Sequence, residues 1–492
     1  MKTRTRPQVE SLEGRTLLSA GDLDLTFGGT GIVATSIGSW SNQSTDLLVQ
    51  PDGKVLQVGS ETPVIHGGTM VAMVRYNVDG TRDASFGTGG VVTTGIGATF
   101  NGTYGDSVSA AALDPASGKI VVVGQASTYN KKYVVPAVFM VARYNPNGTL
   151  DTTFNRTGYV VTNFGSYSSN RVIVQGDGKI VASMDGGTNF SLARFNTDGT
   201  MDASFGNGGL VTGSKPSAYP GGNSFLYAMA YQPADGKILA TGTADTTSGL
   251  PNNTFALARY NSSGTLDTTF GPNHDGTVIT YLGGTYAEAH GIVIQPDGKV
   301  VIAGLTATSG TTTNVYGSAL ARYNPDGTLD SSFGSGGVVQ TNTVLHATDL
   351  VLLADGNFMV EALPKDSSGT IIRQFALARF TPSGVFDTTF GTNGVVTTYV
   401  GANGNPNSIA LAPDGKVVLG GSVNRPTSSG NSNREFVIAR YLGDPSPPAP
   451  LTAQATAPAT LTATATDPTL IPLVLDDPLF LNTLAKEKRR HA

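Results

Sequence analysis

Three charged residues occupy equivalent positions in an internal repeat of this 492-residue sequence, and they are the first candidates for chemistry. Asp46, Arg171 and Asp349 each precede by seven residues the glycine of a recurrent turn of the Asp-Gly-Lys type. The corresponding position in the other repeats, seven or eight residues before the turn glycine, is taken by Ala110, Ala228, Gly291 and Ser408. If the fold brings these positions together, the charged residues form a polar rim for a ligand, or paired carboxylates for acid–base catalysis. The alternative is a set of ordinary solvated strand ends.

Other catalytic or metal-binding motifs are not found in the sequence. The histidines are too scattered for a metal-ligand spacing such as HExxH: His66, His274, His290, His346 and His491. Neither a GxSxG elbow nor a phosphate-binding loop is present, and the chain has no cysteine. We therefore expect no metal site and no cofactor, and we assign no catalytic residue.

Aromatic residues that do not recur from repeat to repeat form a second group of ligand-binding candidates. They lie in the polar connections between repeat strands: Trp40, Tyr104, Tyr129, Tyr167, Tyr219, Tyr286 and Tyr316. Connections rich in Gly, Ser, Asn and Tyr on a rigid scaffold are typical of recognition surfaces. The alternative is that each ring anchors its own loop.

The elements that position these residues follow from a repeat of about sixty residues. Successive turn glycines are separated by 65, 60, 58, 62, 58 and 59 residues: Gly53, Gly118, Gly178, Gly236, Gly298, Gly356 and Gly415. Each repeat contains an apolar run, a turn, a second apolar run, an ARYN segment, another turn and a DxTFG segment. This order predicts four short strands per repeat and seven repeats, which is a seven-bladed β-propeller of the all-β class.

A fixed spacing between an arginine and an aspartate indicates how the propeller closes. The two residues stand eight positions apart in six repeats, as in Arg75 and Asp83, which predicts an ion pair across a three-residue hairpin loop. Arg440 lacks an aspartate downstream, and Asp24 lacks an arginine upstream. We therefore expect the segment near Asp24 to supply the last strand of the final blade, which removes open sheet edges.

One phenylalanine recurs in every repeat. The set is Phe27, Phe86, Phe154, Phe205, Phe270, Phe333 and Phe390. Repetition in each blade indicates packing between neighbouring sheets rather than a stacking platform for a ligand.

The repeat segments QPDGKVVIAG (295–304), SALARYNPDGTLD (318–330) and FDTTFGTNGVVTT (386–398) resemble those of the delta-60 repeat family of bacterial β-propellers, and the resemblance covers about 420 of the 492 residues. Residues Val9–Ser19, VESLEGRTLLS, also resemble an LExRxLLS-type N-terminal leader of bacterial surface proteins. The first resemblance implies the propeller but brings no reaction or catalytic residues. The second implies an extracellular or cell-surface location.

The sequence divides into a leader (1–20), a propeller (21–443) and a tail (444–492). The tail starts with a Pro/Ala/Thr linker and ends in a segment with the charge polarity of a short amphipathic helix. The net charge of −5 argues against nucleic acid as a partner, and no apolar run is long enough to span a bilayer.

Three functional hypotheses remain open. The first is a non-enzymatic, exported or surface-associated monomeric propeller that binds a protein or glycan through the face with the longer loops. The second is a hydrolase or lyase with acidic residues at the mouth of the channel. The third is a structural module without a specific ligand.

Overall fold

The computed structural model of this protein describes residues 19–38, 41–62, 68–96, 105–130, 133–162, 171–185, 189–214, 216, 223–245, 254–308, 315–366, 370–426 and 432–444. The chain divides into two units, Met1–Pro445 and Ser446–Ala492. The predicted linker and amphipathic helix of the tail lie outside the described residues, as does most of the predicted leader.

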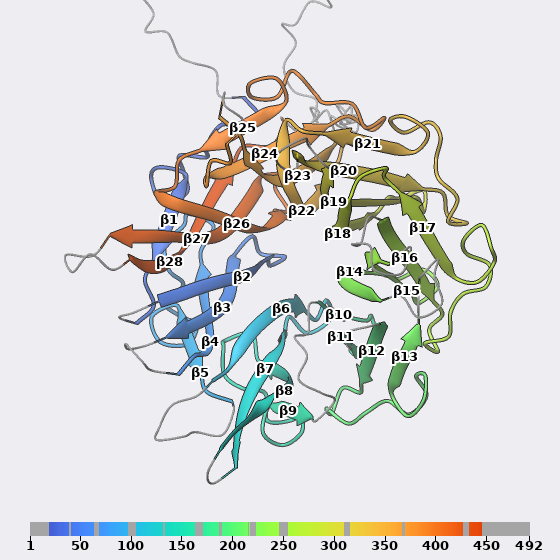
Figure 1. The fold of residues 1–492 in the computed structure, drawn as a ribbon. Helices are drawn as coiled ribbons and strands as arrows, with labels where there is room; N and C mark the ends of the chain where they lie inside the picture. Colours follow the sequence, from blue (N-terminus) through green and yellow to red (C-terminus); the bar gives the residue numbers. More distant parts are fainter. Residues whose placement is uncertain are drawn as a thin grey trace, which may run out of the picture. The chain divides into compact units, whose positions relative to one another are not determined.

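Seven four-stranded antiparallel sheets surround a central axis, as the repeat predicted (Figure 1). The innermost strands are β2 (Ser41–Val49), β6 (Ser107–Leu113), β10 (Val172–Val174), β14 (Ser224–Gln232), β18 (Tyr286–Ile294), β22 (Val344–Leu352) and β26 (Ala402–Leu411). The second strands are β3 (Val55–Thr62), β7 (Ile120–Asn130), β11 (Ile180–Asp185), β15 (Lys237–Ala244), β19 (Val300–Thr308), β23 (Phe358–Pro364) and β27 (Val417–Pro426). The third strands are β4 (Met70–Tyr76), β8 (Tyr133–Tyr144), β12 (Phe190–Phe195), β16 (Thr254–Tyr260), β20 (Val315–Tyr323), β24 (Phe375–Phe380) and β28 (Ser432–Tyr441). The outer strands are β5 (Val91–Thr94), β9 (Tyr159–Thr162), β13 (Leu210–Ser214), β17 (Thr277–Tyr281), β21 (Val338–Thr341), β25 (Val395–Thr398) and β1 (Ile32–Thr35).

We number the blades 1 to 7 from β2–β5 to the blade of β26, β27, β28 and β1. In blade 7, β1 pairs with β28 in the register Ile32↔Ala439 to Thr35↔Phe436. The two unmatched residues of the repeat meet there, with Asp24 Oδ2 2.8 Å from Arg440 Nε. The predicted closure of the ring by its N-terminal strand is therefore confirmed.

The core consists of seven apolar clusters, each between two adjacent sheets. Every cluster contains one repeat phenylalanine at most 1% exposed, for example Phe86 between blades 1 and 2 and Phe27 between blades 7 and 1. The phenylalanines thus pack neighbouring blades together, where burial of a large ring contributes most to stability.

The repeated Arg–Asp pairs are present in all seven blades, with N–O distances of 2.6 to 2.8 Å. Each guanidinium also lies 4.3 to 4.8 Å from the centre of its phenylalanine ring. In six blades a turn lysine approaches the aspartate to between 2.9 and 3.2 Å, whereas blade 6 carries Asn357 at that position. The ion pairs are thus parts of a buried cluster rather than isolated surface contacts.

This cluster joins each blade to the next. Arg259 Nη1, for example, donates to the carbonyl oxygen of Pro325 in the following blade at 2.5 Å. Burial alone would raise the pKa of Asp267, but hydrogen bonds from Thr269 and Lys237 and the charge of Arg259 hold that pKa well below its usual range. For Asp24, the hydrogen bonds from Thr26 and the charges of Arg440 and Lys416 outweigh burial and lower the pKa to about 2.

In blades 1 to 6 a short turn follows the third strand, but the sequence after β28 in blade 7 lacks this turn motif. Other residues make the contacts that the turn makes elsewhere. In other blades a turn glycine such as Gly384 covers the phenylalanine of the preceding blade, here Phe333. At blade 7, Gly21 covers Phe390 instead, since a Cβ added to Gly21 would lie 2.6 Å from that ring. Asp444 likewise replaces the missing carbonyl group, with Oδ1 2.6 Å from Arg379 Nη1.

The ends of the strands define two faces. The tight-turn face carries the short turns between first and second strands and between third and outer strands, such as the loop closed by Gln50 N–H donating to Lys54 O. The long-loop face carries the other connections. Since Asp24 and Asp444 both join this network of short turns, both ends of the described propeller leave from the tight-turn face.

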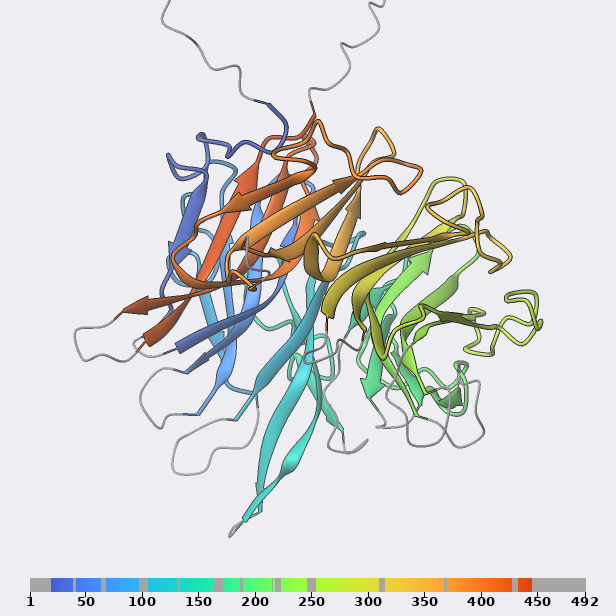
Figure 2. The same cartoon turned by 45° about the horizontal axis from the view of Figure 1, so that its top comes forward.

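The structure differs from the prediction in two local features. Residues 127–137, a polar stretch between two repeat strands that the sequence predicts to be loop, are largely strand, because β7 and β8 extend into a long hairpin that projects beyond its neighbours (Figure 2). In blade 5 the DxTFG segment spans Leu329–Thr341 and is predicted from the sequence to form the fourth strand, but it is largely turn and only its end forms β21. The glycines of this segment explain the difference, since Gly334, Gly336 and Gly337 all have positive φ.

Candidate functional site

A β-bulge recurs at one level of the innermost strands. The pairing of first and second strands shifts between Ser44 and Asp46 in blade 1, and equivalent shifts occur in blades 2, 4, 5, 6 and 7. In blade 3, β10 begins only at Val172, so Arg171 directly precedes it. Because a bulge places two residues opposite one, it redirects side chains and commonly borders functional sites.

Asp46 and Asp349, the predicted rim carboxylates, form hydrogen bonds with neighbouring blades. Asp46 accepts hydrogen bonds from the backbone N–H of Ala111 at 2.9 Å and from the hydroxyl of Ser408 at 3.1 Å. Asp349 accepts one from the backbone N–H of Ile409 at 3.2 Å. Since Ala111 and Ile409 belong to the following blade in each case, these carboxylates help to hold neighbouring inner strands in register.

Arg171 provides the positive charge that faces both aspartates. Burial raises the pKa of Asp46, and the charge of Arg171 opposes that increase. Burial raises the pKa of Asp349 to about 6, with Arg171 opposing and the charge of Asp46 adding to the increase. The structure therefore brings these three sequence candidates together, although the two carboxylates are more enclosed than solvated strand ends would be.

Glu361 on β23 belongs to the same group and was missed from the sequence. It pairs with Asp349 across the strands, accepts a hydrogen bond from the hydroxyl of Thr348, and is 1% exposed. Burial raises the pKa of Glu361 to about 8, and the charge of Asp349 adds to the effect. One signal was available: the equivalent positions of the other blades hold uncharged residues, such as Val58 in blade 1 and Ala303 in blade 5.

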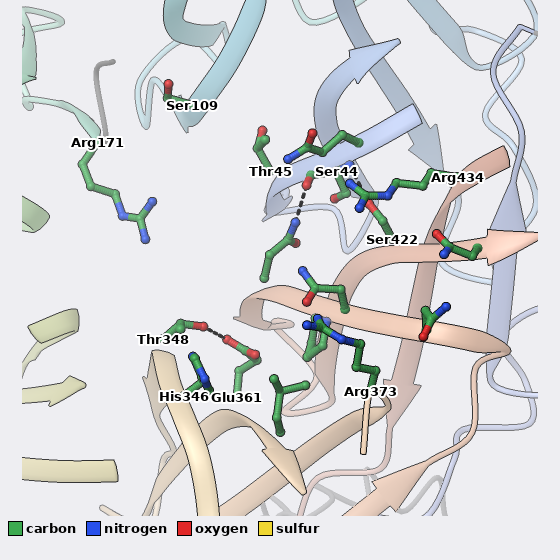
Figure 3. A pocket seen from close by; sticks show the side chains of 17 residues that line it. Ser44, Thr45, Ser109, Arg171, His346, Thr348, Glu361, Arg373, Ser422 and Arg434 are labelled. Atoms are coloured by element: carbon green, nitrogen blue, oxygen red, sulfur yellow. Dashed lines mark hydrogen bonds between the residues drawn. The ribbon is translucent and has the colours of Figure 1, made fainter. Parts of the chain in front are cut away.

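A cavity of about 720 Å³ opens beside these residues on the long-loop face, as Figure 3 shows. Its walls come from the beginnings of β2, β6, β22, β26 and β28, the ends of β23 and β27, and the residues just before β10 and β24. The lining residues are Gln43, Ser44, Thr45, Ser109, Arg171, His346, Thr348, Glu361, Leu363, Arg373, Asn403, Asn405, Pro406, Asn407, Ser422, Asn424 and Arg434. Nearly all of these side chains donate or accept hydrogen bonds.

Two residues of the lining have strained backbones. His346 and Asn403 have φ values of 55° and 52°, in the left-handed region that residues other than glycine seldom adopt. Both lie within the bulges of their strands. Burial lowers the pKa of His346, and the nearby His290 and Arg373 lower it further, so this imidazole is neutral at pH 7. Such strain is frequent where a protein preorganises a ligand site.

A second cluster lies on blades 4 and 5, around the carboxylate of Glu288. Tyr227 donates to Glu288 Oε1 at 2.9 Å, and Tyr286 donates to the same oxygen. His290 Nε2 lies 2.9 Å from Glu288 Oε2, and its ring stacks on Tyr227 with 4.5 Å between the centroids. A carboxylate that orients an imidazole is an arrangement suited to proton transfer. Sequence reasoning missed this cluster because His290 stands 63 residues from Tyr227.

The aromatic candidates have different outcomes. Tyr286 is half-buried against Glu288, and Tyr316 is 44% exposed. Tyr129 lies in β7, but its side chain is outside the described part of the structure. Trp40, Tyr104, Tyr167 and Tyr219 also lie outside the described residues. Their role as ligand-binding residues therefore stays a prediction.

Two findings concern metal ions and membranes. Within the described residues, no group of three or more His, Asp or Glu side chains is placed to hold a metal ion. No helix in the same part of the chain is long and apolar enough to cross a bilayer.

Six segments of the chain match the family model described as "Domain of unknown function (DUF5122) beta-propeller". The matched residues are 50–86, 116–154, 175–205, 234–270, 295–333 and 369–390. Every segment ends at a repeat phenylalanine, so the match follows the blades. Together with the seven sheets, the match supports the β-propeller fold. The delta-60 assignment and the leader stay predictions.

Among solved structures, the chain is similar to the polysaccharide lyase Uly1 (11% identity, 84% of this chain and 91% of that chain, TM-score 0.45). It is also similar to virginiamycin B lyase from Staphylococcus aureus (11%, 83% and 98%, TM-score 0.43). A third similarity is to α-L-arabinanase from Penicillium chrysogenum (12%, 68% and 93%, TM-score 0.40). These similarities are too distant to carry an inference about activity. No curated protein matches the sequence.

Proposed function

We propose that this protein is an exported or surface-associated binding propeller whose ligand, a glycan, occupies the cavity on the long-loop face. The observation that carries the proposal is the lining of that 720 Å³ cavity, in which Leu363 and Pro406 are the only apolar residues among those that the structure describes. A volume of this size is within the range of about 300–1,000 Å³ that is usual for ligand sites. Protein interfaces instead favour aromatic and apolar anchors. A concave, hydroxyl- and amide-rich wall therefore suits a sugar better than a protein surface.

Export is supported by sequence features alone. The resemblance of Val9–Ser19 to a surface-protein leader is the basis for it. Fractionation of cells that produce the protein natively tests this part of the proposal. Recovery of the protein only from the cytosol would contradict export and leave glycan binding to be judged separately.

Binding is tested on a glycan array with the full chain and two tryptophan variants. Asn405→Trp places a bulky ring in the cavity from an exposed position and should abolish retention of any glycan that the native protein binds. Asn207→Trp, at an exposed turn position before β13, is the matched control and should leave retention unchanged. Equal retention by both variants, or no retention of any glycan by the native chain, would refute the proposed function. The second result would favour a structural module without a specific ligand.

A hydrolase or lyase is the second candidate, favoured by the raised carboxyl pKa values at the cavity. With a pKa of about 8, Glu361 carries a proton at pH 7, as a general acid must. Incubation of each bound glycan with the native chain, Glu361→Gln and Asp349→Ala separates the two functions. Turnover by the native chain that both substitutions abolish would establish the enzyme. Binding without turnover would support the binding propeller.

A further inference from the structure

The charge of the cavity is opposite to that of the whole chain. The sequence carries a net charge of −5, yet the cavity lining contains three arginines and a single carboxyl side chain, that of Glu361. That carboxyl is buried against Thr348 and Asp349 at one wall, where its ionised form is disfavoured. The side chains that line the cavity therefore carry a net positive charge at neutral pH, although Asp46 and Asp349 beside the lining balance part of the charge of Arg171.

Two of the arginines are not committed to a partner. Arg373 precedes β24, Arg434 lies in β28, and both are exposed. Within the described part of the chain, neither guanidinium has a carboxylate at ion-pair distance, whereas the seven repeat arginines are all paired. Guanidinium groups that are left open toward a cavity are suited to bind carboxylate, sulfate or phosphate oxygens through paired hydrogen bonds.

The third arginine faces them from another blade. Arg171, in blade 3, lies across the cavity from Arg373, with His346 and Glu361 near the latter (Figure 3). Asp46 and Asp349 neighbour Arg171 and hold it in place electrostatically. Because the positive groups are distributed around the cavity, a ligand with several anionic groups along its length matches them better than a single small anion.

The uncharged part of the lining narrows the class of this ligand. Asn403, Asn405, Asn424 and Gln43 present side-chain amides, which bind hydroxyl groups both as donors and as acceptors. No aromatic side chain is among the lining residues that the structure describes, although bases of single-stranded nucleic acids are usually held by aromatic stacking. A ligand that carries both hydroxyl groups and repeated negative charges is an acidic polysaccharide.

We propose that the cavity selects an acidic glycan, whose carboxylate or sulfate groups bind Arg373, Arg434 and Arg171 while amides of the lining bind its hydroxyls. This inference rests on the proposed glycan-binding function and specifies its ligand. It identifies Arg373 and Arg434 as the residues that distinguish acidic from neutral sugars.

The experiment measures binding of four polymers to the full chain by titration calorimetry at constant ionic strength. Polygalacturonate carries carboxylates, its fully methyl-esterified form has lost them, dextran sulfate carries sulfates, and dextran is neutral. We expect polygalacturonate or dextran sulfate to bind, and the tighter of the two identifies the anionic group. Esterified polygalacturonate and dextran should bind at least about ten-fold more weakly, since a charge-assisted hydrogen bond contributes about 1.5–3 kcal/mol.

Charge variants locate the effect within the cavity. Arg373→Glu should weaken binding of the acidic polymer at least about ten-fold, and Arg373→Lys should retain part of it because the positive charge remains. Arg82→Glu changes the net charge equally at an exposed turn on the tight-turn face and should change affinity less than two-fold. Equal losses in Arg373→Glu and Arg82→Glu would overturn the inference, because the attraction would then be a property of overall charge.

Other outcomes separate this inference from the proposed function. Binding of dextran or esterified polygalacturonate as tight as that of the acid form would overturn acidic selectivity while glycan binding stands. Tighter binding of a single-stranded oligonucleotide or of polyglutamate, measured in the same way, than of every glycan would overturn both proposals. The absence of binding to any of the four polymers would overturn acidic selectivity alone, because the glycan array tests glycan binding separately.

Discussion

The tight-turn face carries the same buried Arg–Asp–Phe cluster in each of the seven blades, whereas the corresponding inner-strand position toward the long-loop face varies among Asp, Ala, Arg, Gly and Ser. At the first face each repeat arginine is paired with an aspartate, and contacts such as that of Arg259 with Pro325 link one blade to the next. At the second, Arg373 and Arg434 stay open to the cavity. The comparison teaches that, in this propeller, residues that recur in every blade hold the ring together. Residues that differ between blades mark the surface that can select a ligand.

The largest effect is expected from a repeat arginine. Arg259→Ala leaves Asp267 buried without its main partner and removes the bond to Pro325 of the next blade. The free energy of unfolding should fall by roughly 3–5 kcal/mol, the cost of breaking a buried ion pair. Denaturant unfolding measures this change, and glycan affinity of the folded protein should remain unchanged.

Arg373→Ala is the matched control on the other face. It should alter the free energy of unfolding by less than about 0.5 kcal/mol, as exposed substitutions usually do. If Arg259→Ala cost no more than Arg373→Ala, the distinction between an assembly face and a recognition face would be lost.

An intermediate, pH-dependent effect is expected for Glu361→Gln. The folded-state pKa of about 8 lies above the ordinary value of 4.5, so the folded chain retains a proton that the unfolded chain releases. As pH rises from about 4.5 to 8, native Glu361 therefore lowers the free energy of unfolding, and glutamine does not. The variant should equal the native protein at pH 4.5 and exceed it by more than about 1 kcal/mol at pH 8.5, since one pKa unit corresponds to about 1.4 kcal/mol.

Thermal unfolding at these two pH values measures the difference. A constant difference between variant and native protein at both pH values would show that Glu361 is not buried in the manner described. The cavity would then carry an ionised carboxylate at neutral pH, and its preference for anions would be weaker.

The smallest effect is expected at the junction of blades 6 and 7. Asp444 replaces a turn carbonyl as the partner of Arg379, but its side chain is 35% exposed and solvent screens the pair. Asp444→Ala should lower the free energy of unfolding by less than about 1 kcal/mol. A loss as large as that of Arg259→Ala would show that the closing blade depends on this contact more than the regular blades depend on theirs.

The architecture was predictable from the sequence because its contacts repeat. The pair Arg75 and Asp83 recurs with constant spacing, and the unmatched Asp24 and Arg440 predict the closure of the ring. The spacing of the turns also predicted that Asp46, Arg171 and Asp349 lie together.

The remainder of the site was not predictable for a physical reason. Bulges shift the register of the inner strands, so the residues that reach the cavity cannot be counted from the turns alone. Arg373 and Arg434 lie outside the repeat motifs, and Glu288 and His290 acquire significance only through Tyr227 of another blade. Glu361 is the one residue of this group that the sequence could have indicated, because the equivalent positions in the other blades are uncharged.

The ring closes through residues at both of its ends, and the position of these ends determines how the cavity is oriented when the protein is attached to a surface. Ser19–Asp24 and Asp444 reach the same face, on the far side of the disc from the cavity. If the propeller were attached to a surface through either end, the tight-turn face would be turned toward that surface. The long-loop face with the cavity would then point away from it, toward the solvent. Immobilisation through either end should therefore leave capture of a polymer from solution unobstructed, whereas attachment at the β7–β8 hairpin should hinder it.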